Sequence, residues 1–340
     1  MPTYLHSGLR WFIVRSALIT SVMLGILTPS FLAVAQSPPK LLHIGYLAGG
    51  GRTPDGAPPS LLREGLRDLG YVEGQNVVYE ARFAEGKLER LAGLAAELVG
   101  LKVDVIVVNG GPAATAAKQA TATIPIVMAV AGGDAVATGL IASLAYPGGN
   151  VTGLTDESVQ LSAKRMQLLK EAVPQAALIA ILWNTNDPGM TLRYREIEKA
   201  AQLLHVEVQA LGVRGPEDFA DAFSTMTRRR PDALFLVADG LTTTNRKLLL
   251  EFAATHHIPA MYELGFIVRE GGLMAYGPGQ EDSYRLAARY IDRIVKGAKP
   301  ADLPAEQPTR YYLAVNLKTA ATLGLTFPPS VLLRTDDVVQ

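Results

Sequence analysis

The chain contains no cysteine among its 340 residues. Without a thiol it cannot form a disulfide, a zinc–thiolate site or a cysteine nucleophile. It also cannot carry the lipid anchor of a bacterial lipoprotein, which is attached to a cysteine at the cleavage point. The 32 basic and 32 acidic side chains cancel to a formal net charge of zero, so the charge balance favours neither nucleic acid nor an anionic membrane surface as a partner.

Several motifs of catalysis and nucleotide binding are absent as well. Gly49-Gly50-Gly51 is not followed by the Gly-Lys-Ser/Thr of a phosphate-binding loop, and no G-x-G-x-x-G opens the first expected helix. There is no G-x-S-x-G nucleophile elbow and no H-x-x-x-H metal pair. We therefore expect a protein that is not an enzyme and that carries no cofactor and no metal.

The first 36 residues have the layout of a secretory signal peptide. Arg10 and Arg15 precede an uncharged apolar run, Pro29 interrupts it, and Ala33-Val34-Ala35 follows before Gln36. The apolar run is shorter than the roughly 20 residues that span a bilayer, and small residues at an A-x-A site fit a signal peptidase. The sequence predicts cleavage near Ala35 and a periplasmic protein that is not a lipoprotein. An uncleaved membrane anchor is the alternative.

After Lys40, short apolar runs alternate with amphipathic stretches. Continuous apolar runs are typical of strands buried on both faces of a parallel sheet, and strand–helix alternation over such a length predicts a doubly wound α/β fold. The expected strands include Leu41–Leu47, Val103–Val108, Ile124–Val130, Leu178–Trp183, Ala233–Val237 and Leu273–Tyr276. The expected helices are Leu61–Leu69, Leu88–Val99, Val159–Val173, Leu192–Leu204 and Tyr284–Val295.

Gly/Pro-rich breaks divide this pattern into two lobes. They fall near Tyr146–Gly153, at Gly277-Pro278-Gly279 and around Leu303–Pro308. Three breaks imply three crossovers between two doubly wound parallel-sheet lobes. We expect lobe one to comprise residues 40–152 plus 277–308, and lobe two residues 153–276 plus 309–335.

Turn-forming segments follow five of the strands. In open parallel sheets, ligands bind beyond the carboxyl ends of the strands, where helix N-termini present free N–H groups. The segments that we expect at such a pocket are Ala48–Gly51, Asn109–Pro112, Ala131–Asp134, Asn184–Asp187 and Ala238–Gly240.

Some of these residues allow two interpretations. Asp134 precedes an apparent helix over Ala135–Ala145, so it is either an N-cap or a carboxylate that faces a ligand ammonium group. Trp183 is either a core residue or the cover of an apolar ligand group, with Asn184 and Thr185 as hydrogen-bonding partners. Phe266, which follows the short strand Ile258–Tyr262, could add an aromatic wall.

Several stretches resemble a family of ABC-transporter substrate-binding proteins that includes tryptophan- and tyrosine-binding members. The similarity runs from about Leu42 to Val339. The segments that carry it are Ile124–Val127, Ser143–Gly153, Gly271–Pro278, Val295–Pro304, Glu306–Thr309, Val315–Ala320 and Leu323–Leu325.

The resemblance implies the type I periplasmic-binding-protein fold, in which two lobes close over a small molecule. Members of the family often have a hydroxyl residue where this chain has Gly111, so here that contact can come only from backbone N–H groups. They also favour Asp-Pro-Val where this chain has Asp134-Ala135-Val136.

We therefore expect a periplasmic receptor of an ABC importer that takes an amino acid, with aromatic ones favoured, or a related amphoteric metabolite. Its partners would be a small-molecule ligand and the inner-membrane permease and ATPase subunits, and it would be a monomer. A sensor that signals to a membrane kinase or chemoreceptor is an alternative, and a secreted α/β enzyme is a further one. The candidate ligand-binding residues are Ala48, Gly49, Gly50, Gly110, Gly111, Pro112, Ala113, Gly133, Asp134, Thr155, Trp183, Asn184, Thr185, Asp239, Gly240, Glu263 and Phe266.

Overall fold

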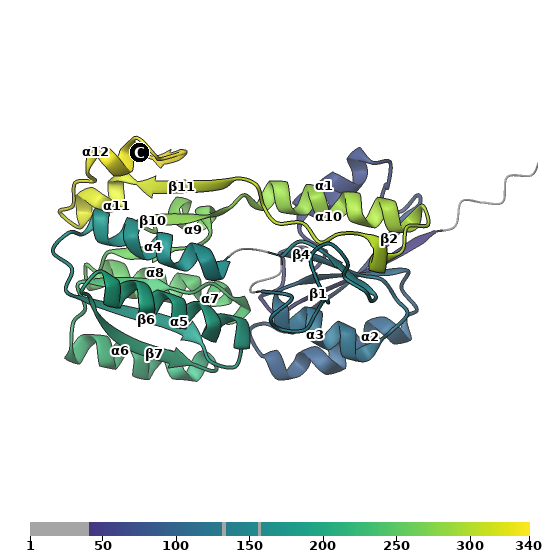
Figure 1. The fold of residues 1–340 in the computed structure, drawn as a ribbon, viewed down its shortest axis with the longest axis horizontal. Helices are drawn as coiled ribbons and strands as arrows, with labels where there is room; N and C mark the ends of the chain where they lie inside the picture. The colour runs from purple at the N-terminus through teal and green to yellow at the C-terminus, as the bar shows by residue number, and fades with distance from the viewer. Residues whose placement is uncertain (1–40, 131–133, 156–157) are drawn as a thin grey trace, which may run out of the picture. The chain divides into compact units, whose positions relative to one another are not determined.

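A computed structural model describes residues 41–130, 134–155 and 158–340 of the chain. The predicted signal peptide and Gly133 therefore lie outside the described residues. Within the described part, the strands form a five-stranded sheet and a seven-stranded sheet, each with its own helices (Figure 1). This arrangement confirms the predicted α/β class with two lobes of largely parallel sheet.

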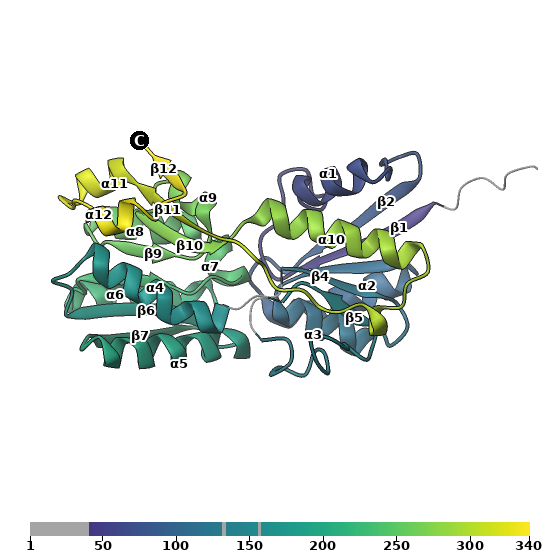
Figure 2. The same cartoon turned by 45° about the horizontal axis from the view of Figure 1, so that its top comes forward.

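The first sheet is parallel throughout, in the order β2-β1-β3-β4-β5. Two helices cover each of its faces (Figure 2), α1 and α10 on one and α2 and α3 on the other. Its strands are β1 (Leu42–Ala48), β2 (Val77–Phe83), β3 (Val105–Asn109), β4 (Ile126–Val130) and β5 (Val151–Gly153). The helices of this lobe are α1 (Ser60–Asp68), α2 (Leu91–Gly100), α3 (Gly111–Ala120) and α10 (Gln280–Val295), with 3₁₀ turns η1 (Leu88–Arg90) and η3 (Pro300–Asp302).

The second sheet has the order β12-β11-β10-β9-β8-β6-β7, and within it only the β10–β11 pair is antiparallel among the described strands. Its strands are β6 (Leu178–Asn184), β7 (Glu207–Val213), β8 (Ala233–Leu236), β9 (Ala260–Tyr262), β10 (Met274–Pro278), β11 (Tyr311–Asn316) and β12 (Asp337–Val339). Its helical elements are α4 (Ser158–Ala172), α5 (Pro188–Leu203), η2 (Pro216–Asp218), α6 (Phe219–Arg228), α7 (Gly240–Thr244), α8 (Arg246–Thr255), α9 (Gly265–Arg269), α11 (Leu317–Thr322) and α12 (Pro329–Leu332).

Each sheet is buried on both faces, which explains the continuous apolar runs in its central strands. In the second lobe, one core cluster packs α4 and α5 against Ile179, Ile181 and Phe235. A separate cluster packs α6, α8 and α9 against Leu182 and Leu234 on the opposite face. Alternate residues of a strand point to opposite faces, so a strand with apolar residues at every position serves two cores.

The chain passes between the two sheets three times, as the sequence predicts for this fold class. The passages lie between β5 and α4, between β10 and α10, and between η3 and β11. Because α10 follows a strand of the second sheet and packs in the core of the first, neither lobe is made of one continuous segment.

The predicted helix over Ala135–Ala145 is wrong, because this segment consists of turns and bends. Gly139 has a φ of 72°, a left-handed conformation that ends a helical turn. The N–H of Leu140 then donates back to the Ala135 carbonyl at 2.9 Å. The segment therefore makes a single turn, although its apolar residues have helical spacing.

Candidate functional site

A cavity of about 240 Å³ lies where loops of both lobes meet. The loops that line it follow β1, β3, β6, β8 and β9, so they belong to the carboxyl ends of parallel strands. Helix N-termini gather at this edge of an open α/β sheet, which makes it the usual ligand site of such folds. The volume is below the roughly 300–1,000 Å³ of pockets for drug-sized ligands, which favours a small metabolite.

The first-lobe wall of the cavity is aromatic and carries no charged side chain among its described lining residues. Tyr46 and Phe83 pack with their ring centroids 5.8 Å apart. Asn109 donates its side-chain amide to the hydroxyl of Tyr284 at 3.1 Å and to that of Tyr46 at 3.3 Å. Burial raises the pKa of both tyrosine hydroxyls, so they stay protonated and act as neutral hydrogen-bonding groups.

The N-terminus of α3 opens into the same wall. Gly110 has a φ of 97°, a conformation that glycine adopts without strain, and Gly111, Pro112 and Ala113 form the first turn. The first N–H groups of a helix have no partner within it and attract negative charge. This turn can therefore bind a carboxylate through the main chain alone.

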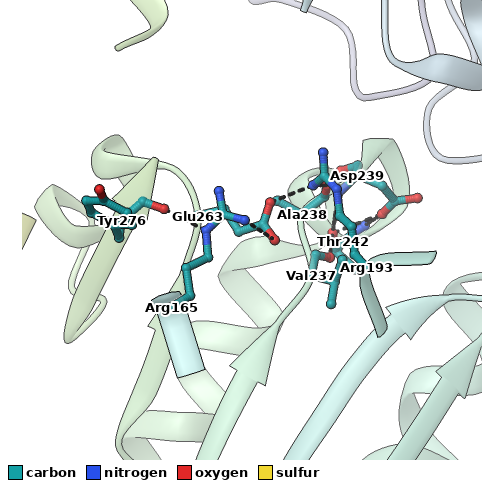
Figure 3. Close-up of polar contacts among 8 residues, drawn as sticks. All are labelled: Arg165, Arg193, Val237, Ala238, Asp239, Thr242, Glu263 and Tyr276. Carbon is teal, nitrogen blue, oxygen red and sulfur yellow. Dashed lines mark hydrogen bonds and ion pairs between the residues drawn. The ribbon is translucent and has the colours of Figure 1, made fainter. Parts of the chain in front are cut away.

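The second-lobe wall contains a buried ionic triad (Figure 3). Glu263, which follows β9, lies between two arginines: Arg165 Nη1 is 3.3 Å from Oε1 and Arg193 Nη1 is 2.6 Å from Oε2. The side chains of Arg165 and Arg193 are 0% and 2% exposed. Arg165 also donates from Nε to the Tyr276 carbonyl of β10 at 2.7 Å. The triad thus connects the cavity with the strand that leads into the second passage.

Two aspartates extend the charged wall beside this triad. Asp239 accepts hydrogen bonds from Asn184 Nδ2 at 2.6 Å and from the N–H and hydroxyl of Thr242, both at 2.9 Å. Asp187 caps α5 by accepting from the Gly189 N–H at 2.9 Å. Burial, and secondly the negative charge of Asp239, raise the pKa of Asp187 to about 6.

Ten of the predicted site residues line this cavity, and they come from both lobes. Those of the first lobe belong to the loops after β1 and β3, and those of the second lobe to the loops after β8 and β9. The residues are Ala48, Gly49, Gly50, Gly110, Gly111, Pro112, Ala113, Asp239, Gly240 and Glu263.

Six other candidates lie outside the cavity. Asp134 caps a turn by accepting from the N–H groups of Val136 and Ala137. Thr155 is buried near Ala135. Trp183 is a core residue that stacks on Tyr194 at a centroid distance of 3.8 Å.

The last three of these candidates belong to the second lobe. Asn184 is buried behind Asp239 and holds its carboxylate, so it supports the wall without lining it. Thr185 donates its hydroxyl to the Val213 carbonyl at 3.3 Å. Phe266 packs beneath the Arg246 guanidinium, 5.4 Å from the ring centroid.

Sequence reasoning missed several lining residues, above all Arg165 and Arg193. Both lie on the apolar faces of expected helices. Arg165 comes three to four positions from Leu161, Leu168 and Leu169, and Arg193 has a similar place between Met190 and Ile197. A charged residue in the apolar stripe of a helix needs a buried partner, and that signal would have identified both.

These features define a two-lobed ligand-binding protein. The cavity holds charged and aromatic groups, and the described residues contain no group of histidines and acidic residues that could hold a metal ion. Over the same described segments, none of the helices is both long enough and apolar enough to cross a membrane.

The chain belongs to the ABC transporter substrate binding protein family, whose model matches residues 60–339. This is a family of binding proteins rather than catalysts, and its members bind small molecules and work with membrane components of ABC transporters. The chain is therefore the substrate-binding protein of an ABC transporter.

Known relatives include both sequences and solved structures. A tyrosine-binding protein of Clostridioides difficile (strain R20291) is 27% identical over 261 residues, 76% of this chain and 74% of that protein. The structure of an ABC domain in complex with L-Trp from Streptococcus pneumoniae has a TM-score of 0.79 and 26% identity, covering 88% of this chain and all of that one. A conserved domain protein of Vibrio cholerae shares the fold, with a TM-score of 0.81 at 24% identity over 88% of this chain and 100% of that one.

Proposed function

We propose that this protein is the exported receptor of an ABC importer and that its ligand is an aromatic amino acid or a closely related amphoteric metabolite. The observation that carries the proposal is the division of the cavity into an aromatic, uncharged wall on one lobe and a wall of paired charges on the other. An aromatic amino acid has the same division, with an apolar ring at one end and two charges at the other.

The groups of such a ligand match specific parts of the cavity. The ring would pack against Tyr46 and Phe83, since aromatic pairs gain about 0.5–1.5 kcal/mol beyond their buried area. The α-carboxylate would accept hydrogen bonds from the free N–H groups at Gly111 and Ala113. These contacts leave the α-ammonium group to the charged second-lobe wall, so that one molecule bridges both lobes.

Bridging explains how such a receptor would work without covalent chemistry. A ligand that contacts both walls binds the conformation with close lobes better than one with separated lobes, and it shifts the population toward the former. The permease and ATPase subunits would then recognise the ligand-bound form. Two relatives support the ligand class by what their names state: one is tyrosine-binding and the other was solved with L-Trp.

Export is part of the proposal. Residues 1–36 would direct the chain to the periplasm and be removed near Ala35, which leaves a free, monomeric receptor without a lipid anchor. Expression of the full chain, followed by osmotic release of the periplasm and intact-mass measurement, tests this. We expect a protein that begins at or near Gln36, and retention of the first 36 residues in the membrane fraction would contradict it.

Native mass spectrometry of the purified protein, followed by denaturation, identifies any ligand that it retains. Isothermal titration with L-tryptophan, L-tyrosine and L-phenylalanine, and with L-leucine and L-glutamate as controls, then measures selectivity. We expect one-to-one binding of at least one aromatic amino acid. A Tyr46→Leu variant should lose affinity for it by about tenfold, from the lost aromatic contact and hydroxyl. Binding of none of these amino acids would remove the amino-acid assignment and leave the receptor role to another ligand.

A further inference from the structure

Among the residues that the structure describes, the charged wall of the cavity has one carboxyl group more than it has guanidinium groups. Asp187, Asp239 and Glu263 line it together with Arg165 and Arg193, so the net charge of these five side chains is −1 when every group is ionised. No lysine or histidine is among the described residues that line the cavity. The described part of the wall therefore lacks one positive charge.

The excess negative charge lies at the aspartate pair rather than at Glu263. Glu263 has a guanidinium group at each of its two oxygens. Asp239 is held by donors from Asn184 and Thr242. Asp187 accepts its hydrogen bonds from the backbone at the start of α5, and within the described structure no side chain donates one to it.

The surroundings of Asp187 oppose its ionisation. Asp187 is only 4% exposed, and burial together with the charge of Asp239 raises its pKa to about 6. The backbone N–H groups of α5 and the Arg193 guanidinium act in the opposite direction. Beyond Arg193 lie Glu263 and Arg165, and the facing first-lobe wall adds the neutral Tyr46, Asn109 and Tyr284.

We propose that Asp187 and Asp239 together bind a primary ammonium group of the ligand, and that Asp187 gives up a proton to solvent as this group enters the cavity. The step is an exchange in which the neutral carboxyl and the ammonium ion become a carboxylate–ammonium pair plus one released proton, with no covalent bond formed in the ligand. This inference rests on the proposed function, since an α-amino acid supplies such an ammonium group.

Proton release is measured by isothermal titration of L-tryptophan at pH 6 in buffers that differ in ionisation enthalpy. We expect about half a proton released per molecule bound at pH 6, because Asp187 is then near its midpoint, and almost none at pH 8. Affinity should therefore rise with pH between about 5 and 7. Binding without proton release at pH 6 would overturn the inference and leave the proposed function intact.

The Asp187→Asn variant separates ligand binding from helix capping, because asparagine caps helices as well as aspartate does. We expect it to be at least as stable as the unsubstituted protein, to release no proton and to bind L-tryptophan about 10- to 100-fold more weakly at pH 7.5. Its affinity for indole-3-propionate, which has no amine, should not fall. Asp221→Asn, at an exposed position on α6, is the matched control and should bind like the unsubstituted protein. Equal affinity of Asp187→Asn for L-tryptophan would contradict the inference.

A simple cation tests the site even if no amino acid binds. Methylammonium chloride should raise the melting temperature of the unsubstituted protein more than tetramethylammonium chloride at the same concentration, because only the former donates N–H groups to carboxylates. We expect this difference to disappear in Asp187→Asn. Equal effects of the two salts on the unsubstituted protein would contradict an ammonium site, and this outcome is independent of which ligand the receptor carries.

Discussion

Asp187 also makes the stability of the ligand-free protein depend on pH. Its folded-state pKa of about 6 lies above the ordinary value of 3.8, so the folded state binds this proton more tightly than the unfolded chain does. The contribution of Asp187 to stability is then fully present below pH 4 and is lost as the pH rises through 6. We expect Asp187→Asn to gain about 2–3 kcal/mol relative to the unsubstituted protein between pH 4 and pH 8.

Urea unfolding of both proteins at several pH values between 4 and 8 measures this gain. The free energy of unfolding of Asp221→Asn should follow that of the unsubstituted protein at each pH, since its side chain is exposed. A constant difference between Asp187→Asn and the unsubstituted protein over the whole range would show that Asp187 keeps an ordinary pKa.

The triad of Arg165, Glu263 and Arg193 depends on its single carboxylate. In Glu263→Gln both buried guanidinium groups would lose the carboxylate that they share, and breaking a buried ion pair in this way costs about 3–5 kcal/mol. We expect a fall of that size in the free energy of unfolding, measured with urea at pH 7. Glu171→Gln, whose carboxylate pairs with Arg334 at the surface, should cost at most about 1 kcal/mol. Similar costs for the two variants would contradict a structural role for the triad.

At the scale of single residues, the sequence predicts the parts of the site that are built from backbone groups better than the parts that are built from side chains. Gly49, Gly110 and Gly240 could be placed because glycine-rich turns follow apolar strands. Arg165 and Arg193 follow no strand, and their only signal in the sequence is the place of a charged residue in the apolar stripe of an expected helix. Asp134 was predicted as a candidate and lies outside the cavity. An aspartate caps a turn in the same way whether or not a ligand is near, so the sequence does not separate the two roles.

At the scale of elements, the end of β10 needs a glycine at position 277. A Cβ added at Gly277 would lie 2.1 Å from the Glu263 carbonyl oxygen, a backbone atom that cannot move aside alone. We expect Gly277→Ala to move β10 away from the loop that carries Glu263, and to lower both the melting temperature and the affinity for ligand. Differential scanning fluorimetry and titration measure these two effects.

Gly93→Ala is the matched control for Gly277→Ala. Nothing lies within 4 Å of a Cβ added at Gly93 in α2, and alanine favours a helix over glycine by about 0.5–1 kcal/mol. This variant should therefore be slightly more stable than the unsubstituted protein. If Gly277→Ala behaved in the same way, β10 and the Glu263 loop would not be in the close contact described above.

The elements that the sequence predicts are those with two buried faces. Central strands such as β3 and β6 are continuous apolar runs, whereas the edge strands β2 and β7 have partly exposed residues that interrupt the pattern. These two strands therefore form no continuous apolar run, and the pattern that identifies the central strands does not apply to them. The helix predicted over Ala135–Ala145 is wrong for the converse reason. The spacing of its apolar residues is helical, but Gly139 ends the helix after one turn.

At the scale of the whole molecule, the two lobes touch through glycines beside the cavity. A Cβ added at Gly240, the first residue of α7, would lie 2.5 Å from the Gly49 carbonyl carbon and 2.8 Å from the Gly50 nitrogen. Gly49 and Gly50 belong to the first lobe and Gly240 to the second. The close approach of the lobes at this point therefore requires that Gly240 has no side chain.

We expect Gly240→Ala to hold the lobes apart without removing any side chain that faces the ligand. An overpacked contact costs about 1–3 kcal/mol, and this cost falls only on the conformation with close lobes. Affinity for ligand should fall by roughly 5- to 150-fold, while the melting temperature of the ligand-free protein changes little. Small-angle X-ray scattering should show compaction on ligand addition in the Gly93→Ala control and less of it in Gly240→Ala. Ligand binding shifts the population from separated lobes toward close lobes. Unchanged affinity and compaction in Gly240→Ala would therefore mean that the ligand-bound conformation does not contain the contact between Gly240 and the Gly49–Gly50 backbone.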